Sequence, residues 1–205
     1  DSITNPTNGN KGSNFLDNVT SSLIKADILC CKNTTESVTE AQRIYNNILK
    51  DNPRNIASIV GLARCLTRFN EFDQVEKLLN FILSEKPFLE NCSYFEEAYL
   101  ILAHIVEKKK SLASSQHYIF FALELNMSCK KAWEMSAMVN LSNKLYHEAA
   151  IAFGHLWELC NHNDPQIGYQ YALCSMKEKK YEVALIVCRE VLRLEPGYKD
   201  LKQEI

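Results

Sequence analysis

The stretch KAWEMSAMVNLSNKLYHEAAIAFGHLW, residues Lys131–Trp157, decides the fold of this chain. Its apolar residues recur at intervals of three and four, the period of an α-helix. With Trp133 at position 4 of a 34-residue unit, Ala137 falls at position 8, Ala149 at 20 and Phe153 at 24. Small residues at positions 8 and 20 let two antiparallel helices approach closely, and the large residues fill the space beside them. The stretch therefore predicts a pair of packed helices.

The same register recurs on both sides of this stretch. It gives five units at residues 22–55, 56–89, 96–129, 130–163 and 165–198, with residues 90–95 inserted before the third. Pro53, Pro87 and Pro196 fall at position 32, where a residue without an N–H ends the second helix. This is the tetratricopeptide pattern. It predicts an all-α tetratricopeptide α-solenoid, a right-handed superhelix of antiparallel helix pairs, because stacked pairs bury stripes that one pair leaves exposed.

The two ends of the chain are less regular than its middle. The array is expected to occupy residues 15–205, with a polar capping helix at residues 199–205. Residues 1–14 are polar and are expected to be disordered or loosely attached. The N-terminus has no initiating methionine and no signal-peptide pattern, so we expect a fragment of a longer protein.

The charge of the chain is balanced, with 23 basic and 25 acidic residues and a formal net charge of −2. This balance gives no electrostatic reason to expect binding to nucleic acid or to an anionic membrane. No apolar run approaches the roughly 20 residues that span a bilayer, so membrane insertion is not expected. The eight cysteines form no C-x-x-C motif, and we expect them to be reduced and structural in a cytosol-like compartment.

The histidines and tryptophans of the opening stretch are candidates for a metal or stacking site. His147 and His155 are eight residues apart, and position 151, where a helical H-E-x-x-H motif needs its second histidine, is isoleucine. Trp133 and Trp157 fall where packing between repeats needs bulk. We therefore interpret this stretch as the wall of a helical scaffold.

The remaining candidates for chemistry have equally plain explanations. Adjacent Cys30 and Cys31 could be redox-active or bind a soft metal, but packing on a helix face is the preferred interpretation. Glu96 and Glu97 are expected at a helix start, where negative charge is favourable. The chain contains no Gly-rich phosphate loop and no G-x-S-x-G motif. No catalytic residue, cofactor site or metal site is predicted, and no small-molecule substrate.

The first helix of each unit is expected to line a concave face. Some tetratricopeptide arrays bind a C-terminal carboxylate there through a clamp of lysine, arginine and asparagine. Positions 5 and 9 of that face carry Val60 and Arg64, Leu100 and His104, Glu134 and Met138, and Tyr169 and Leu173. The clamp is absent, which disfavours a chaperone adaptor. The candidate partner contacts on this face are Arg64, Arg68, His104, Lys108, Tyr169 and Lys177.

Four segments resemble a known family in this order: FEEAYLILAHI (Phe95–Ile105), CKKAWEMSAMV (Cys129–Val139), YHEAAIAFGHLWELCNHNDPQIGYQYA (Tyr146–Ala172) and KKYEVALIVCREVLRLEPGY (Lys179–Tyr198). They are similar to the C-terminal repeats of the tetratricopeptide repeat protein 21 family, the large solenoid subunit of intraflagellar transport complex A. NDPQIGYQYA is the most specific piece, because Gly-Tyr stands where most repeats carry a large aromatic residue. The resemblance covers about residues 39–200, and the polar N-terminus does not match.

This resemblance implies a non-enzymatic scaffold of retrograde ciliary transport and cilium assembly. Its partners would be the WD-repeat and tetratricopeptide subunits of complex A, in the cytoplasm, the cilium or flagellum and the basal body. No partner-binding residue carries over, because packing positions define the family. Two alternatives stay open: a tetratricopeptide adaptor or peptide-groove binder of another assembly, and a small helical metalloenzyme. Many further repeats upstream would favour the transport subunit.

Overall fold

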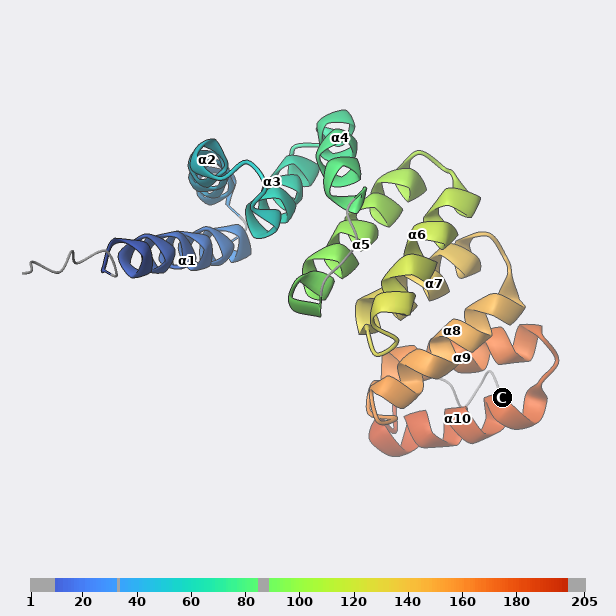
Figure 1. The fold of residues 1–205 in the computed structure, drawn as a ribbon. Helices are drawn as coiled ribbons and strands as arrows, with labels where there is room; N and C mark the ends of the chain where they lie inside the picture. The colour runs from blue at the N-terminus through green and yellow to red at the C-terminus, as the bar shows by residue number, and fades with distance from the viewer. Residues whose placement is uncertain (1–9, 33, 85–88, 199–205) are drawn as a thin grey trace, which may run out of the picture. The chain divides into compact units, whose positions relative to one another are not determined.

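The computed structural model describes residues 10–32, 34–84 and 89–198, and these residues form helices and turns without a β-strand. The helices are α1 (Asn10–Cys31), α2 (Thr35–Asp51), α3 (Ile56–Arg68), α4 (Phe72–Leu83), the short 3₁₀ helix η1 (Leu89–Asn91), α5 (Cys92–Lys108), α6 (Leu112–Leu125), α7 (Lys130–Ser142), α8 (Tyr146–Leu159), α9 (Pro165–Lys177) and α10 (Tyr181–Leu194). Helices α7 and α8 pack on each other as antiparallel neighbours, and so do α9 and α10 (Figure 1). The prediction of an all-helical chain is confirmed.

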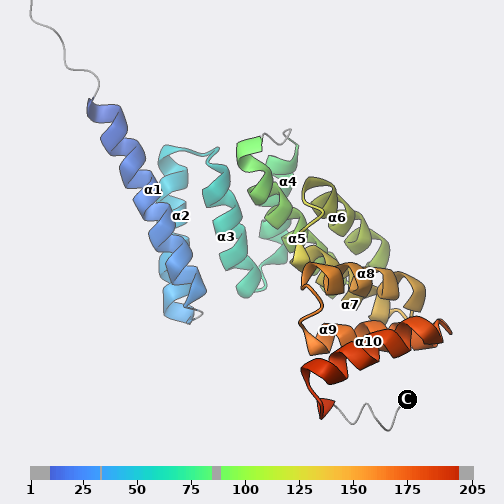
Figure 2. The same ribbon diagram turned by 90° about the horizontal axis from the view of Figure 1, so that it is seen from below.

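The helices belong to two compact parts, which divide within α5 between Ile101 and Leu102. In the first part, α1 packs on α2 and also on α3, and α3 packs on α4 (Figure 2). In the second part, each helix from α6 to α10 packs on the next along the chain. Neighbours in sequence are therefore neighbours in space within each part, as a repeat array requires.

The N-terminal end differs from the sequence-based expectation. Helix α1 begins at Asn10, so residues 10–14 are helical rather than disordered or loosely attached. Extending a helix that has already formed costs little, which explains the longer N-terminal end. The insertion at residues 90–95 is also structured, because η1 is followed at once by α5, which begins at Cys92. Residues 1–9, Pro87 and the expected cap at residues 199–205 lie outside the described residues.

Four of the turns within helix pairs repeat one backbone motif. In each of these turns, the second residue after the first helix of the pair has a positive φ near 60°. The N–H of the residue that follows it donates a hydrogen bond to the backbone carbonyl five residues earlier in the chain. The positive-φ residues are Asn70, Lys110, Lys144 and Lys179, and the bonds are Glu71 to Leu66, Ser111 to Val106, Leu145 to Asn140 and Lys180 to Ser175, at 2.9–3.1 Å. This is the Schellman ending of a helix, which usually places glycine at the positive-φ position.

The lysine at this position in the fourth pair predicts a stabilising substitution. Lys144 has φ 61° and an exposed side chain, and a left-handed conformation costs a residue with a Cβ about 1–2 kcal/mol. Lys144→Gly is expected to raise the free energy of unfolding by about 1 kcal/mol. Arg189→Gly, on the exposed side of α10, should lower it by about 1 kcal/mol because glycine is a poor helix former. Chemical denaturation of both variants checks the opposite signs, and a loss of stability in Lys144→Gly would contradict the argument.

The core of the second part follows the register read from the sequence. Ala137 and Ala149 are completely buried and lie in one cluster with buried Phe153. Trp157 is buried in the next cluster, against α9 and α10. Trp133 is only partly buried, and its indole N–H donates to the Met127 carbonyl at 2.9 Å. The packing role is confirmed for Trp157, while Trp133 covers the edge of its cluster.

The unusual glycine of NDPQIGYQYA has a steric explanation. Gly168 lies in α9, where a Cβ would come within 2.6 Å of Val191 Cγ2 and 2.8 Å of Trp157 Cζ3. Both neighbours are buried, so they cannot move aside freely. The Trp157 indole of the preceding pair therefore fills space next to α9 that leaves no room for a side chain at position 168.

Candidate functional site

A groove of about 450 Å³ lies on the second part, between α7, α8 and α9. Buried Phe153 and Leu156 lie at its floor, and Met138 on its α7 side is 52% exposed. The remaining lining residues are apolar Leu141 and Ile167, Cys160, and the polar side chains Lys130, Glu134, Asp164, Gln166 and Gln170. An apolar floor with polar groups at the edge is the usual composition of a binding groove. Its mixed charge favours a partner segment that inserts an apolar side chain between polar ones.

The candidate contacts in the second part do not line this groove. None of His104, Lys108, Tyr169 and Lys177 is among its lining residues. The His104 ring lies 3.9 Å from the Glu107 carboxylate, and the Tyr169 ring packs on Tyr198 at 5.8 Å. Lys108 and Lys177 are exposed at the ends of α5 and α9. The sequence had placed Glu134 and Met138 on the same face without selecting them as contacts.

In the first part, Arg64 is held in an internal ion-pair network. Its guanidinium donates to both Glu97 oxygens, from Nε at 2.7 Å and from Nη2 at 2.8 Å. Nη1 donates to Asp27 Oδ1 at 3.1 Å, and the Tyr45 hydroxyl donates to the same oxygen at 2.7 Å. The network joins α1, α2, α3 and α5. A bidentate pair is stronger and more directional than a single contact, so Arg64 holds helices together.

The acidic partner of Arg64 was misread at the sequence level. Because α5 begins at Cys92, Glu97 lies in its second turn and not at its start. The macrodipole explanation is therefore wrong for Glu97, which pairs with Arg64 at a sequence separation of 33. The pair joins the first helices of successive units, α3 and α5, but the insertion at residues 90–95 makes the repeat spacing here 40 residues, so the register gave no signal for it. Arg68 is exposed on α3, one turn beyond Arg64.

A pair of buried thiols lies next to this network. Cys30 Sγ on α1 and Cys65 Sγ on α3 are 3.2 Å apart, and the two side chains are 1% and 0% exposed. Cys31, which the sequence offered as the neighbour of Cys30, is exposed. The two facing cysteines are 35 residues apart, about one repeat.

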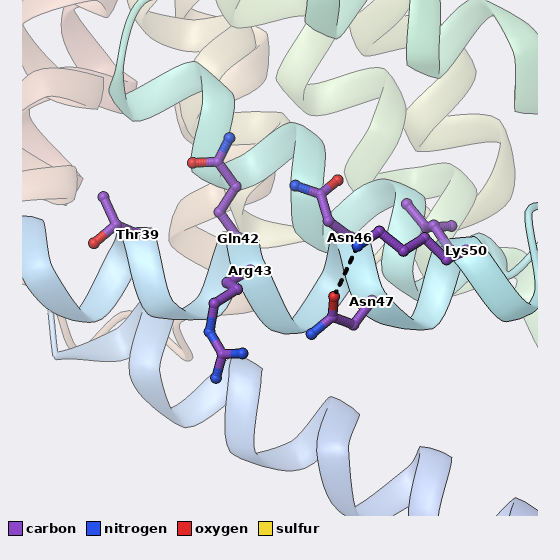
Figure 3. Close-up of a pocket in the computed structure, with 7 residues that line it drawn as sticks. Thr39, Gln42, Arg43, Asn46, Asn47 and Lys50 are labelled. Atoms are coloured by element: carbon purple, nitrogen blue, oxygen red, sulfur yellow. Dashed lines mark hydrogen bonds between the residues drawn. The ribbon is translucent and has the colours of Figure 1, made fainter.

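A shallow hollow on α2 is polar and formed by one helix. Its volume is about 670 Å³, and its lining residues are Thr39, Gln42, Arg43, Asn46, Asn47, Leu49 and Lys50 (Figure 3). Arg43 is already paired with Glu40 at 2.7 Å, and Lys50 donates to Asn47 at 3.4 Å. All seven of these lining residues belong to α2, so we assign the hollow no ligand.

The two histidines of the opening stretch lie apart in separate surroundings. His147 is exposed, with its Nδ1 3.4 Å from a Glu178 oxygen. The His155 ring stacks on the Trp133 indole at a centroid distance of 4.3 Å. Within residues 10–32, 34–84 and 89–198, no three His, Cys, Asp or Glu side chains gather as metal ligands would.

Among the described residues, no helix combines the length and the apolar character that crossing a bilayer requires.

Comparison with known proteins assigns the family. A family model described as the Tetratricopeptide repeat protein 21 C-terminal ARM domain matches residues 10–205. The chain belongs to the tetratricopeptide repeat protein 21 family. Tetratricopeptide repeat protein 21B of Mus musculus is 26% identical over 182 residues, covering 86% of this chain and 14% of the relative. The human 21B protein is 23% identical over 169 residues, covering 82% and 13%. The chain thus spans about one seventh or less of these family members.

Solved structures similar to this family member share its fold. The MamA protein superposes with a TM-score of 0.64 at 19% identity, covering 91% of this chain and 96% of MamA. YrrB, described as a TPR protein with an unusual peptide-binding site, gives a TM-score of 0.62 at 15% identity and covers 89% of each chain. The predicted tetratricopeptide α-solenoid is confirmed, as is the predicted resemblance to the tetratricopeptide repeat protein 21 family.

Proposed function

We propose that this chain is a C-terminal protein-interaction region of an intraflagellar transport complex A subunit, acting in retrograde ciliary transport and cilium assembly. The observation that carries the proposal is membership of the tetratricopeptide repeat protein 21 family over residues 10–205. The partners would be WD-repeat and tetratricopeptide subunits of complex A, met in the cytoplasm, the cilium and the basal body. The region would act by binding alone, without catalysis or a cofactor.

The groove between α7, α8 and α9 is the proposed place of contact. It offers an apolar floor of Phe153 and Leu156 beneath exposed Met138, with charges of both signs at its edge. Such a surface suits a helical or extended protein segment better than a polyanion, because Lys130 is accompanied by Glu134 and Asp164. The fold analogy with YrrB, described as a peptide-binding protein, supports the same use.

A matched pair of double variants tests the groove. Glu134→Lys with Met138→Asp changes two exposed residues on α7 in the groove, while Glu148→Lys with Ile151→Asp makes the same chemical changes on exposed positions of α8 outside it. Both are placed in the full-length protein and expressed in ciliated cells. Co-purification with the other complex A subunits should fall at least tenfold for the first variant and stay unchanged for the second, and retrograde movement should slow only for the first.

The possible results test the proposed role in complex A and the proposed binding groove separately. If the wild-type protein never co-purifies with complex A subunits, the transport role is wrong, and an adaptor of another assembly becomes the better conclusion. If it co-purifies and both variants, shown to be folded, bind normally, partners bind elsewhere on the chain.

The candidate charges are expected to contribute only in combination. A solvent-exposed charge typically contributes about 1 kcal/mol or less to an interface. Single reversals of Arg68, Lys108 or Lys177 should therefore change complex recovery less than about fivefold, and reversal of all three, with His104 and Tyr169 replaced, should abolish it. Arg64 is left out of the set, because its reversal would disrupt the ion pairs with Asp27 and Glu97. Normal recovery of the combined variant would show that these residues bind no partner.

A further inference from the structure

Cys30 and Cys65 face each other across the contact between α1 and α3. Their sulfur atoms are 3.2 Å apart, about 1.2 Å longer than a disulfide bond of about 2.0 Å. Both thiols are buried among the helices of the first part, so packing holds the two sulfur atoms facing each other. A small movement of either side chain would bring the pair to bonding distance.

Charged groups around the pair favour a thiolate. The positive charges are those of Arg64 and Arg68 on α3. Asp27 on α1 and Glu97 on α5 each form an ion pair with Arg64. The Tyr45 hydroxyl on α2 donates a hydrogen bond to Asp27. A hydrogen bond from Cys65, together with the positive charges of Arg64 and Arg68, lowers the pKa of Cys30 to about 6.

Another buried thiol shows the contrast. Burial and the negative charge of Glu178 raise the pKa of Cys174 to about 11. Cys174 is as buried as the pair but lies in a core cluster of small and aromatic side chains. Burial and a nearby negative charge therefore raise the pKa of Cys174, whereas the surroundings of Cys30 lower its pKa although it is equally buried.

Access to the pair is provided by its place in α1. Cys30 is the next to last residue of that helix, and exposed Cys31 follows it. The last turn of a helix opens more readily than its middle. Opening of this single turn would admit a small molecule to Cys30 while α3 stays in place.

We propose that Cys30 and Cys65 form a reversible dithiol–disulfide site that a hydroperoxide oxidises, linking α1 covalently to α3. The Cys30 thiolate attacks one peroxide oxygen, the O–O bond breaks, and Cys30 sulfenic acid and an alcohol form after the alkoxide takes up a proton. The Cys65 sulfur then attacks the sulfenic sulfur, the S–S bond forms, and the hydroxyl leaves as water with the Cys65 proton. Two thiols lose two electrons in total and the peroxide gains them.

The bond would join the first helix pair to the second. It would close a loop between positions 30 and 65 and so restrict the unfolded chain. The thermal midpoint of the first part is expected to rise by roughly 10 °C or more on oxidation and to return after reduction by a dithiol. Oxidation would thereby fix the packing of the two pairs on each other.

Peptide mapping of the whole chain tests the site. Trypsin cleaves after Lys25, Lys32, Arg64 and Arg68, which releases residues 26–32 with Cys30 and Cys31, and residues 65–68 with Cys65. After treatment with hydrogen peroxide and alkylation, the two peptides should be recovered as one linked species, with a mass about 2 Da below their sum. The link should persist in Cys31→Ser, which leaves only Cys30 in the first peptide, and disappear in Cys30→Ser and Cys65→Ser.

The pH profile of linking, measured with the Cys31→Ser chain, is a second readout that needs no core substitution. With a thiolate forming near pH 6, the rate should rise about tenfold between pH 5 and 7 and less than twofold between pH 7 and 9. A rate that keeps rising about tenfold per pH unit to pH 8.5 would overturn the thiolate step. Two results would overturn the Cys30–Cys65 site itself. One is oxidation of Cys31 or Cys174 before the Cys30–Cys65 disulfide forms, and the other is loss of the disulfide in Cys31→Ser.

Discussion

Replacing Ala149 by tryptophan is expected to unfold the fourth helix pair. Ala149 has no exposed surface and lies where α8 meets α7, in the cluster that contains Ala137 and Phe153. Even a few added methylenes in a packed core typically cost about 1–3 kcal/mol, and an indole has no space at this contact. We expect a loss of at least about 3 kcal/mol in the free energy of unfolding.

Circular dichroism and a thermal melt measure this effect, and the same helix supplies the control. Ile151, two residues along α8, is 47% exposed, so Ile151→Trp should change stability by less than about 0.5 kcal/mol. Equal melts for Ala149→Trp and the wild type would show that position 149 is not the site of closest helix approach.

Adding one methyl group at Gly168 is expected to destabilise the fifth helix pair. The new Cβ would overlap Val191 and Trp157. Alanine favours a helix over glycine by about 1 kcal/mol, but overpacking against two buried side chains costs about 1–3 kcal/mol or more. The net loss for Gly168→Ala is expected to be about 1–2 kcal/mol, and Gly168→Leu should lose more than about 3 kcal/mol.

Two further variants make this second prediction specific to the overlap. Gly154 lies in α8, where a Cβ would stand 3.3 Å from the partly buried Tyr171 ring. Gly154→Ala should therefore be neutral or up to about 1 kcal/mol more stable. In a Val191→Ala background, the overlapping methyl is absent, so Gly168→Ala should cost less than in the wild type. Identical costs in both backgrounds would exclude the steric explanation.

The packing inside each helix pair was readable from the sequence because it depends on local spacing. The register places small residues at Ala137 on α7 and Ala149 on α8, and both are completely buried in one cluster. Helix ends were equally readable, since α2 and α10 end two residues before Pro53 and Pro196. Periodicity and proline report the backbone of a single chain segment, and no knowledge of distant residues is needed.

Contacts between successive pairs were not readable in the same way. Arg64 meets Glu97, and Cys30 meets Cys65, across 33 and 35 residues. The separation is not a constant 34, because the helices differ in length and α5 begins four residues before the expected unit at 96. A register counted from packing positions therefore placed Arg64 on an open surface and Cys30 beside Cys31. Polar and thiol partners depend on side-chain direction as well as spacing.

Helices α6 to α10 each pack on the next helix along the chain. When a helix pair has just been synthesised, the preceding pair on which it packs is therefore already present. Ribosomes add about 5–20 residues per second, so a pair of about 34 residues takes seconds to synthesise. Helical proteins with local contacts fold in microseconds to milliseconds. In the second part, each pair should therefore fold onto the preceding one before the next has been translated, so its apolar surface is exposed only briefly.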